Sequence, residues 1–374
     1  MKDDKEFYFD DVFKEFKRLE EIQEIGKSLG KGAFGVVKEV KYKNKIRAGK
    51  LVMKETLVEE EAIQDLKGPH IIKMDKICRP IKKFNNNTYH LIIMEKAILR
   101  DLGKLNNFFH ERNLLKLIFI KCFDEELSDT VLRYYTRQII NGLETLNKNN
   151  YVHFDIKPEN ILITNNLILK LSDFSISKKF DEKDLTEYKI PGGTLGYLTP
   201  EYYMHKKLNQ ENAKKQDYFA LGCMIFLLKY GLHFLKTKKD DDHDVMADTI
   251  VNLLLRNTNY LYSKKLADED FIIFTTNLVK IDPKDRYDME KIYRNKWLNK
   301  NLDYLEKVVD NFEMDEEKFL LELQKQDFII QKNAIFDINK RNNITNKKIE
   351  SDSNKQNNKN IRKGFRFKKN LYDL

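Results

Sequence analysis

A short polar loop between apolar stretches carries the clearest chemical signal in this 374-residue sequence. The loop contains Asp155, Lys157 and Asn160, and Asp173 follows after a second apolar stretch. A carboxylate can orient a hydroxyl group, and an ammonium group can neutralise a phosphoryl group in transfer. An asparagine and a second aspartate can hold a hard cation such as Mg²⁺. The set therefore predicts phosphoryl transfer, because a polar turn without function rarely assembles these residue types at this spacing.

A glycine-rich turn precedes this loop. Gly30, Gly32 and Gly35 lie between two stretches that read as strands. Glycines let backbone N–H groups approach phosphate oxygens without a Cβ atom in the way. A turn that joins two strands differs from the dinucleotide-binding turn, which opens a helix. Lys54 follows in an apolar strand, where a lysine is usually a solvated edge residue unless a carboxylate and phosphates lie nearby.

The elements that must position these residues fall into two regions with different sequence patterns. Residues 22–96 read as short strands, with one helical piece at 57–67, whereas the chain after Lys96 is mainly helical. Residues 128–148 have the apolar spacing of an amphipathic helix, and residues 217–230 are apolar nearly all round, which is typical of a buried helix. Residues 1–21 are charged with interleaved aromatics, a pattern that predicts a short amphipathic helix packed on the body.

Several ordered motifs in residues 22–299 resemble the eukaryotic-type protein kinases of the serine/threonine class. The motifs read GKGAFGVV from Gly30, HFDIKPENILI from His153, DFS from Asp173 and GTLGYLTPE from Gly193. The resemblance implies an α+β, bilobal fold with a small β-rich N-lobe (22–96) that holds one helix and a larger, mainly helical C-lobe (97–299). It also implies ATP and Mg²⁺ as cofactors and proteins with Ser or Thr hydroxyls as substrates.

The resemblance also implies a role for each residue of the site. Asp155 is expected to be the catalytic base, Lys157 to contact the γ-phosphate, and Asn160 and Asp173 to bind Mg²⁺. Lys54 is expected to contact the α- and β-phosphates. The other residues expected to bind the nucleotide come from the glycine-rich turn, the neighbouring strands, the hinge and the floor of the site: Gly30, Gly32, Gly35, Val37, Val52, Met94, Glu95, Ala97, Asp101 and Leu162.

The carboxylate partner of Lys54 has three candidate positions, because the helix expected to carry it is very short. Five positions separate Lys54 from Glu59, against about 15–20 in this family. Glu59 is favoured because Ala62, Ile63 and Leu66 then fall on the inward face of the helix. The adjacent Glu60 and Glu61 remain alternatives.

Two further departures concern control of activity. Phe154 stands where the family has an arginine that binds a phosphate on the activation loop, and Ser175 replaces the glycine of Asp-Phe-Gly. The loss of this arginine and the missing turns of the short helix, the other place where the family binds an activation-loop phosphate, point the same way. They predict activity that does not depend on activation-loop phosphorylation, although Ser177, Thr186 and Tyr188 are available. The alternative is a pseudokinase scaffold that acts through its tail or through an insertion at 97–127.

Charge and composition describe the rest of the chain. The formal net charge is +9, and residues 332–374 hold 12 Lys/Arg and 4 Asp/Glu, so this tail carries +8 and the remaining chain +1. We expect an acidic helical extension at 300–331 and a basic disordered tail at 332–374 that contacts a polyanion or a protein. The 3 cysteines form no CxxC pair, which excludes a disulfide framework or a cysteine-rich zinc site. The absence of a signal peptide or transmembrane segment predicts a cytoplasmic or nuclear protein.

Overall fold

The computed structural model describes much of the chain up to residue 300, all of it within the first of two compact units, Met1–Glu316 and Glu317–Leu374. The predictions for most of the 97–127 insertion, for the acidic extension after residue 300 and for the basic tail lie outside the described residues. The described residues are 4–19, 22–32, 35–54, 57, 61, 63–64, 66–79, 87–97, 101–102, 127–164, 166–181, 187–235, 243–264 and 268–300.

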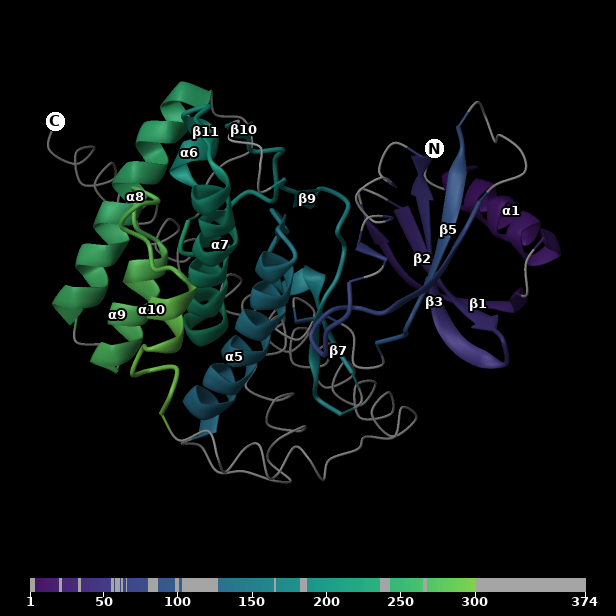
Figure 1. The fold of residues 1–374 in the computed structure, drawn as a ribbon, viewed down its shortest axis with the longest axis horizontal. Helices are drawn as coiled ribbons and strands as arrows, with labels where there is room; N and C mark the ends of the chain where they lie inside the picture. Colours follow the sequence, from purple (N-terminus) through teal and green to yellow (C-terminus); the bar gives the residue numbers. More distant parts are fainter. Residues whose placement is uncertain are drawn as a thin grey trace, which may run out of the picture. The chain divides into compact units, whose positions relative to one another are not determined.

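An antiparallel five-stranded sheet forms the N-lobe, in the order β1-β2-β3-β5-β4. Its register places Val37 opposite Lys50 and Ala48 opposite Met94. Because side chains alternate across a strand, Ala48, Lys50 and Val52 share one face of β3, and Leu51 points to the other. The strands are β1 (Ile22–Gly32), β2 (Gly35–Tyr42), β3 (Lys45–Met53), β4 (Met74–Cys78) and β5 (Tyr89–Met94) (Figure 1).

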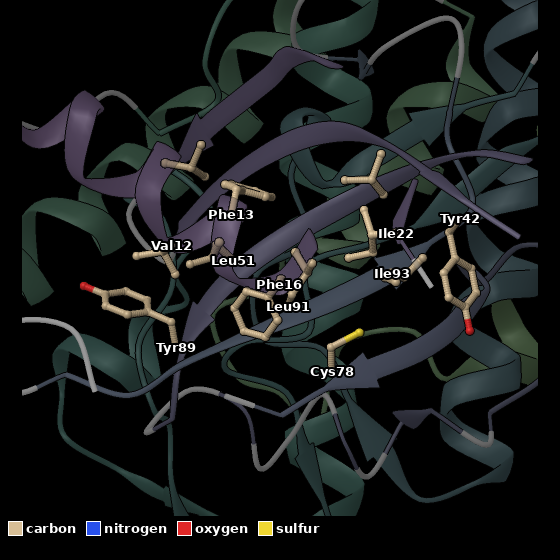
Figure 2. Packing of buried hydrophobic residues seen from close by; sticks show 12 residues of the cluster. Val12, Phe13, Phe16, Ile22, Tyr42, Leu51, Cys78, Tyr89, Leu91 and Ile93 are labelled. Atoms are coloured by element: carbon tan, nitrogen blue, oxygen red, sulfur yellow. The ribbon is translucent and has the colours of Figure 1, made fainter. Parts of the chain in front are cut away.

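Helix α1 (Asp4–Leu19) covers the face of the sheet on which Leu51 lies. The sequence pattern predicted a short amphipathic helix packed on the body, without naming this face. Phe13 and Phe16 are almost fully buried there, and Figure 2 shows them among Leu51 and Leu91 of the sheet. Full burial of a phenylalanine side chain stabilises a fold by about 1.5–3 kcal/mol, so the two rings alone hold the helix firmly on the sheet. Lys50 lies on the opposite face of the sheet.

The C-lobe is mainly helical, which confirms the predicted fold class. The amphipathic stretch forms α5, and the apolar stretch forms the buried part of α7, whose C-terminus is closed by Gly231 in the left-handed conformation. The helices are α5 (Leu127–Lys148), α6 (Pro200–Tyr203), α7 (Gln210–Tyr230), α8 (His243–Lys264), α9 (Glu269–Leu278) and α10 (Met289–Tyr293) (Figure 1). In the part of the chain that the structure describes, no helix is both long and apolar enough to cross a membrane.

Short strand pairs hold the loops that carry the chemical residues. A 3₁₀ turn at Pro158–Asn160 leads from the polar loop into the hairpin β7–β8. The chain after Asp173 pairs twice with neighbouring segments, in β6–β9 and in β10–β11. These strands are β6 (Tyr151–Val152), β7 (Ile161–Ile163), β8 (Leu169–Leu171), β9 (Lys178–Lys179), β10 (Tyr188–Lys189) and β11 (Lys207–Leu208).

Candidate active site

The polar loop forms one connected network around Asp155, which is buried. Asp155 Oδ1 accepts a hydrogen bond from Thr194 Oγ1 at 2.7 Å, and Oδ2 accepts from Lys157 Nζ at 2.6 Å and from Asn160 Nδ2 at 2.9 Å. Lys157 Nζ also lies 2.7 Å from Thr194 Oγ1. The structure therefore brings together a carboxylate, an ammonium group and a threonine hydroxyl, and the hydroxyl occupies a position where the carboxylate accepts its proton in a hydrogen bond.

Two buried groups hold this loop in place. Asp217 in α7 accepts hydrogen bonds from the backbone N–H groups of His153 and Phe154, at 2.8 and 2.9 Å. Burial raises the pKa of Asp217 to about 7, although these two hydrogen bonds act in the opposite direction. Burial lowers the pKa of His153, so the ring is neutral, with Nε2 donating to the Ser172 carbonyl and Nδ1 accepting from the Asp155 N–H. His153 thus positions both the loop and the strand end that precedes Asp173.

Asp173 contacts Lys50 of the sheet, whereas the sequence singled out Lys54 as the lysine of the site. Lys50 Nζ donates to Asp173 Oδ1 at 2.8 Å, and the Lys50 side chain is only 9% exposed. Burial acts to raise the pKa of Asp173, but the Lys50 charge and hydrogen bonds from Lys50 and Ser175 outweigh it and lower the pKa. The carboxylate is therefore ionised, as a cation ligand must be.

Lys54, predicted to bind the phosphates, lies elsewhere. It is exposed and follows the last residue of β3, where its backbone N–H donates to the Thr88 carbonyl. Lys54 lies four positions after Lys50, which amounts to about 13 Å of extended chain. Lys50, not Lys54, is thus the sheet lysine that contacts Asp173. The Ala-x-Lys pattern of Ala48 and Lys50, which retains part of the Val-Ala-Ile-Lys motif, was the available sequence signal.

The glycine-rich turn closes the hairpin between β1 and β2, with Gly32 opposite Gly35. A Cβ atom on Gly35 would lie 1.8 Å from the Leu51 carbonyl oxygen, so no other residue fits at this point of contact with β3. A Cβ atom on Gly30 would meet nothing within 4 Å, so packing does not explain this glycine. An open glycine backbone beside the Lys50 face of the sheet can approach phosphate oxygens closely.

Comparison with known proteins agrees with this geometry. The model of the protein kinase domain matches residues 23–298. The chain belongs to the protein kinase family.

Three curated relatives give the range of similarity. The chain is 27% identical to the Aurora kinase of Eremothecium gossypii over 74% of this chain and 69% of that protein. It is 27% identical to human NUAK family SNF1-like kinase 1 over 75% of this chain but 39% of that protein. It is 30% identical to developmentally-regulated protein kinase 1 of Dictyostelium discoideum over 73% of this chain and 35% of that protein. The chain thus matches well under half the length of the last two relatives.

The segment expected to be the hinge of this kinase is tied to both lobes. Met94 is buried at the end of β5, and the Glu95 carboxylate accepts from Lys170 Nζ of β8 at 2.8 Å and from the Lys73 N–H at 2.7 Å. Lys96 pairs with Glu39 of β2 at 2.8 Å, and Ala97 is half-buried. These contacts fix the segment that the sequence predicts to read the adenine.

The other predicted nucleotide-binding residues divide between the two lobes. Val37 and Val52 lie on β2 and β3, where the register places Val37 opposite Lys50. Asp101 is buried and pairs through its backbone with Leu162 of β7. Val37 and Val52 thus lie in the N-lobe sheet, whereas Asp101 and Leu162 lie together at β7 of the C-lobe.

The structure describes one of the three glutamates that the sequence offers as the partner of Lys54. Glu59 and Glu60 lie outside the described residues. Glu61 is exposed and its carboxylate lies 3.7 Å from Arg79 Nη2. The partner of Lys54 stays a prediction, with Glu59 favoured and Glu60 and Glu61 as alternatives.

Phe154 occupies an apolar cluster. Its backbone has a positive φ of 66°, and its ring contacts Phe180 with centroids 6.3 Å apart. Phe180 in turn meets Tyr188 edge-to-face at 4.6 Å. We name this set the Phe154 cluster; its buried members are Val152, Phe154, Phe180, Ile190, Leu208 and Ala213.

The candidate phosphorylation sites differ in accessibility. Ser177 is fully buried, and its Oγ donates to the His153 carbonyl at 3.2 Å. Tyr188 is half-buried against Phe180, and Thr186 lies outside the described residues. Ser177 therefore serves the packing of the segment in this structure.

Proposed function

We propose that this protein kinase is an active, ATP-dependent enzyme that transfers the γ-phosphoryl group to Ser or Thr hydroxyls of protein substrates. The observation that supports this most directly is the network of Asp155, Lys157, Asn160 and Thr194. Thr194 Oγ1, held 2.7 Å from the Asp155 carboxylate, shows that the carboxylate accepts a hydroxyl group at hydrogen-bonding distance. A substrate hydroxyl in the same place is oriented for in-line attack, because Asp155 accepts its proton.

Lys50 takes the phosphate-binding role in this proposal. It is nearly buried, lies opposite Val37 beside the glycine-rich turn, and contacts Asp173. An ammonium group so enclosed is weakly screened by water, and its charge can hold the α- and β-phosphates. Lys157, bonded to both Asp155 and Thr194, then neutralises charge on the group in transfer.

The donor set fits a magnesium ion. Asn160 commits its Nδ2 group to the Asp155 carbonyl and carboxylate, which leaves its Oδ1 oxygen to bind a cation, and Asp173 supplies an ionised carboxylate. Oxygen donors of this kind suit Mg²⁺, which is usually held by one or two protein groups together with substrate phosphates. When bound, the ion supplies charge neutralisation at the phosphates.

We also propose that activity needs no phosphate on the activation segment. The Phe154 cluster supports this, because a phenylalanine ring packed on Phe180 cannot bind a phosphate, and the apolar contacts order the segment instead. Pairing of β9 with β6 and of β10 with β11 adds backbone hydrogen bonds to the same segment.

The test compares Mg-ATP turnover on Ser/Thr peptides by the wild type and by Asp155→Asn. Activity should fall by about two orders of magnitude or more in the variant, since general base positioning is lost. Equal signals from the two proteins would favour the scaffold alternative. Phosphatase treatment and the variants Thr186→Ala and Tyr188→Phe should change turnover less than about tenfold (about 1.4 kcal/mol), and a larger loss would contradict phosphate-independent activity.

A further inference from the structure

Three exposed lysines lie together on the activation segment and the chain that pairs with it. Lys189 belongs to β10 and Lys207 to β11, and Lys206 directly precedes β11. We call these three residues the lysine surface.

The two strands fix the direction of their side chains. Tyr188 pairs with Leu208, and both pack inward on the Phe154 cluster. Lys189 pairs with Lys207 and therefore points to the opposite, outward side, since successive side chains alternate. Residues directly opposite in an antiparallel pair have Cβ atoms about 4.5–5.5 Å apart, and like charges at that distance destabilise the pair.

No carboxylate neutralises this pair in the described part of the chain. None of the salt bridges there involves Lys189, Lys206 or Lys207. Glu187, the carboxylate closest to Lys189 along the segment, is exposed and pairs with none of the three. A ligand with negative charge would remove the repulsion between Lys189 and Lys207.

The lysine surface lies close to the acceptor position. Lys189 is five residues before Thr194, whose hydroxyl bonds Asp155 at 2.7 Å. Five residues of chain span at most about 18 Å, so a peptide with its hydroxyl at Asp155 reaches Lys189 within about five of its own residues.

We infer that the lysine surface selects peptide substrates with acidic residues within about five positions of the phosphorylated Ser or Thr. The inference rests on the proposed kinase function, because it assigns the surface to the substrate of that site. Carboxylates of the peptide pair with Lys189 and Lys207, which lowers KM and steers association.

The test uses three peptides with one serine each, flanked within about five positions by glutamates, glutamines or lysines. The full chain is compared with the double variant Lys189→Glu/Lys207→Glu. The matched control is Lys280→Glu/Lys296→Glu, which changes the same charge at two exposed C-lobe lysines. kcat/KM and, separately, peptide binding by fluorescence anisotropy are measured at low and physiological salt.

We expect the wild type and the control to prefer the glutamate peptide, with a preference that weakens as salt is raised. The Lys189/Lys207 variant should lose about tenfold or more in kcat/KM and affinity for that peptide, retain turnover of the glutamine peptide, and gain on the lysine peptide. Equal binding of the three peptides by the wild type would overturn the inference. So would an equal loss on the glutamate and glutamine peptides, which signals a structural effect.

Two outcomes separate this inference from the proposed function. Selective binding of the glutamate peptide without phosphorylation of any peptide above the Asp155→Asn background would uphold the lysine surface and refute the kinase activity. Faster turnover of the glutamine peptide in the Lys189/Lys207 variant would overturn the assignment to substrates. It would show that an acidic segment of the chain itself covers the surface, and residues 302–331 hold nine Asp/Glu against three Lys/Arg.

Discussion

Replacement of Lys50 by methionine should abolish most phosphoryl transfer, whereas the same replacement of Lys54 should leave it almost unchanged. Lys50 Nζ lies 2.8 Å from Asp173 Oδ1, and its side chain is 9% exposed, while Lys54 is exposed beyond the end of β3. Methionine keeps the length and apolar character of the lysine stem, so the substitution removes the charge with little change in packing.

The expected loss of kcat/KM in Lys50→Met follows from the burial of the Lys50 side chain. A charged donor aimed at developing charge in an enclosed site contributes about 2.7–4 kcal/mol to the transition state, as in oxyanion sites. Loss of Lys50 should therefore lower kcat/KM at least about 100-fold, at 1.36 kcal/mol for each factor of ten. Lys54 makes no side-chain ion pair within the described residues, and an exposed charge contributes under about 1 kcal/mol, so Lys54→Met should lower kcat/KM less than about fivefold.

The assay is ATP-dependent phosphorylation of a Ser peptide, with Asp155→Asn as the background. Thermal unfolding of each variant shows whether the fold is retained, because Lys50→Met leaves the Asp173 carboxylate without this partner. Nucleotide affinity, measured by equilibrium binding of ATP with Mg²⁺, separates phosphate contact from general damage. A folded Lys50→Met protein with wild-type turnover, or a Lys54→Met protein as inactive as Asp155→Asn, would refute the assignment.

Three further substitutions test the framework of the site. Gly35→Ala should destabilise the protein by more than about 1 kcal/mol in chemical denaturation, because its Cβ atom would meet the Leu51 carbonyl at 1.8 Å; the control Gly30→Ala should cost less. Arg286→Met should lower the free energy of unfolding by about 3–5 kcal/mol, because it leaves the buried Glu201 carboxylate without its cation. In the wild type, Arg286 Nη2 lies 2.6 Å from this carboxylate. An unchanged melting temperature would show that the pair is not structural. The pKa of His153 is lowered by burial, so the stability due to its neutral ring is present above pH 6.5 and is lost as the pH falls. His153→Gln should therefore reduce the acid-induced loss of unfolding free energy by up to about 1.4 kcal/mol per pH unit, and parallel pH profiles would contradict this reasoning.

The sequence predicted the parts of the fold that follow from local pattern. The spacing of apolar residues in 128–148 and the continuous apolar run in 217–230 correspond to α5 and to the buried part of α7. The catalytic loop could also be predicted from the sequence, because Asp155, Lys157 and Asn160 are neighbours along the chain and a short turn brings them together.

The lysine of the sheet was not predicted, because its position depends on a long-range register. Lys50 and Lys54 have the same strand parity and similar neighbours, so alternation alone does not separate them. The pairing of β3 with β2 and β5 ends near Met53, and only this end point places Lys50 inside the sheet and Lys54 outside it. The contact between Lys50 and Asp173 joins residues 123 positions apart, a distance at which local pattern carries no information.

On our proposal of phosphate-independent activity, the Phe154 cluster supplies the free energy that holds the activation segment. In a kinase with arginine at this position, charge-assisted hydrogen bonds to a phosphate supply about 1.5–3 kcal/mol each, and the enzyme that adds the phosphate controls that contribution. Burial of one phenylalanine ring supplies about the same amount, 1.5–3 kcal/mol, and is present whenever the chain is folded. Because Phe154 and Phe180 are both more than nine-tenths buried, the apolar contacts alone can match one or two phosphate contacts. Under the proposal that activity needs no phosphate on this segment, phenylalanine thus replaces a contribution that another enzyme switches by one that is present whenever the chain is folded.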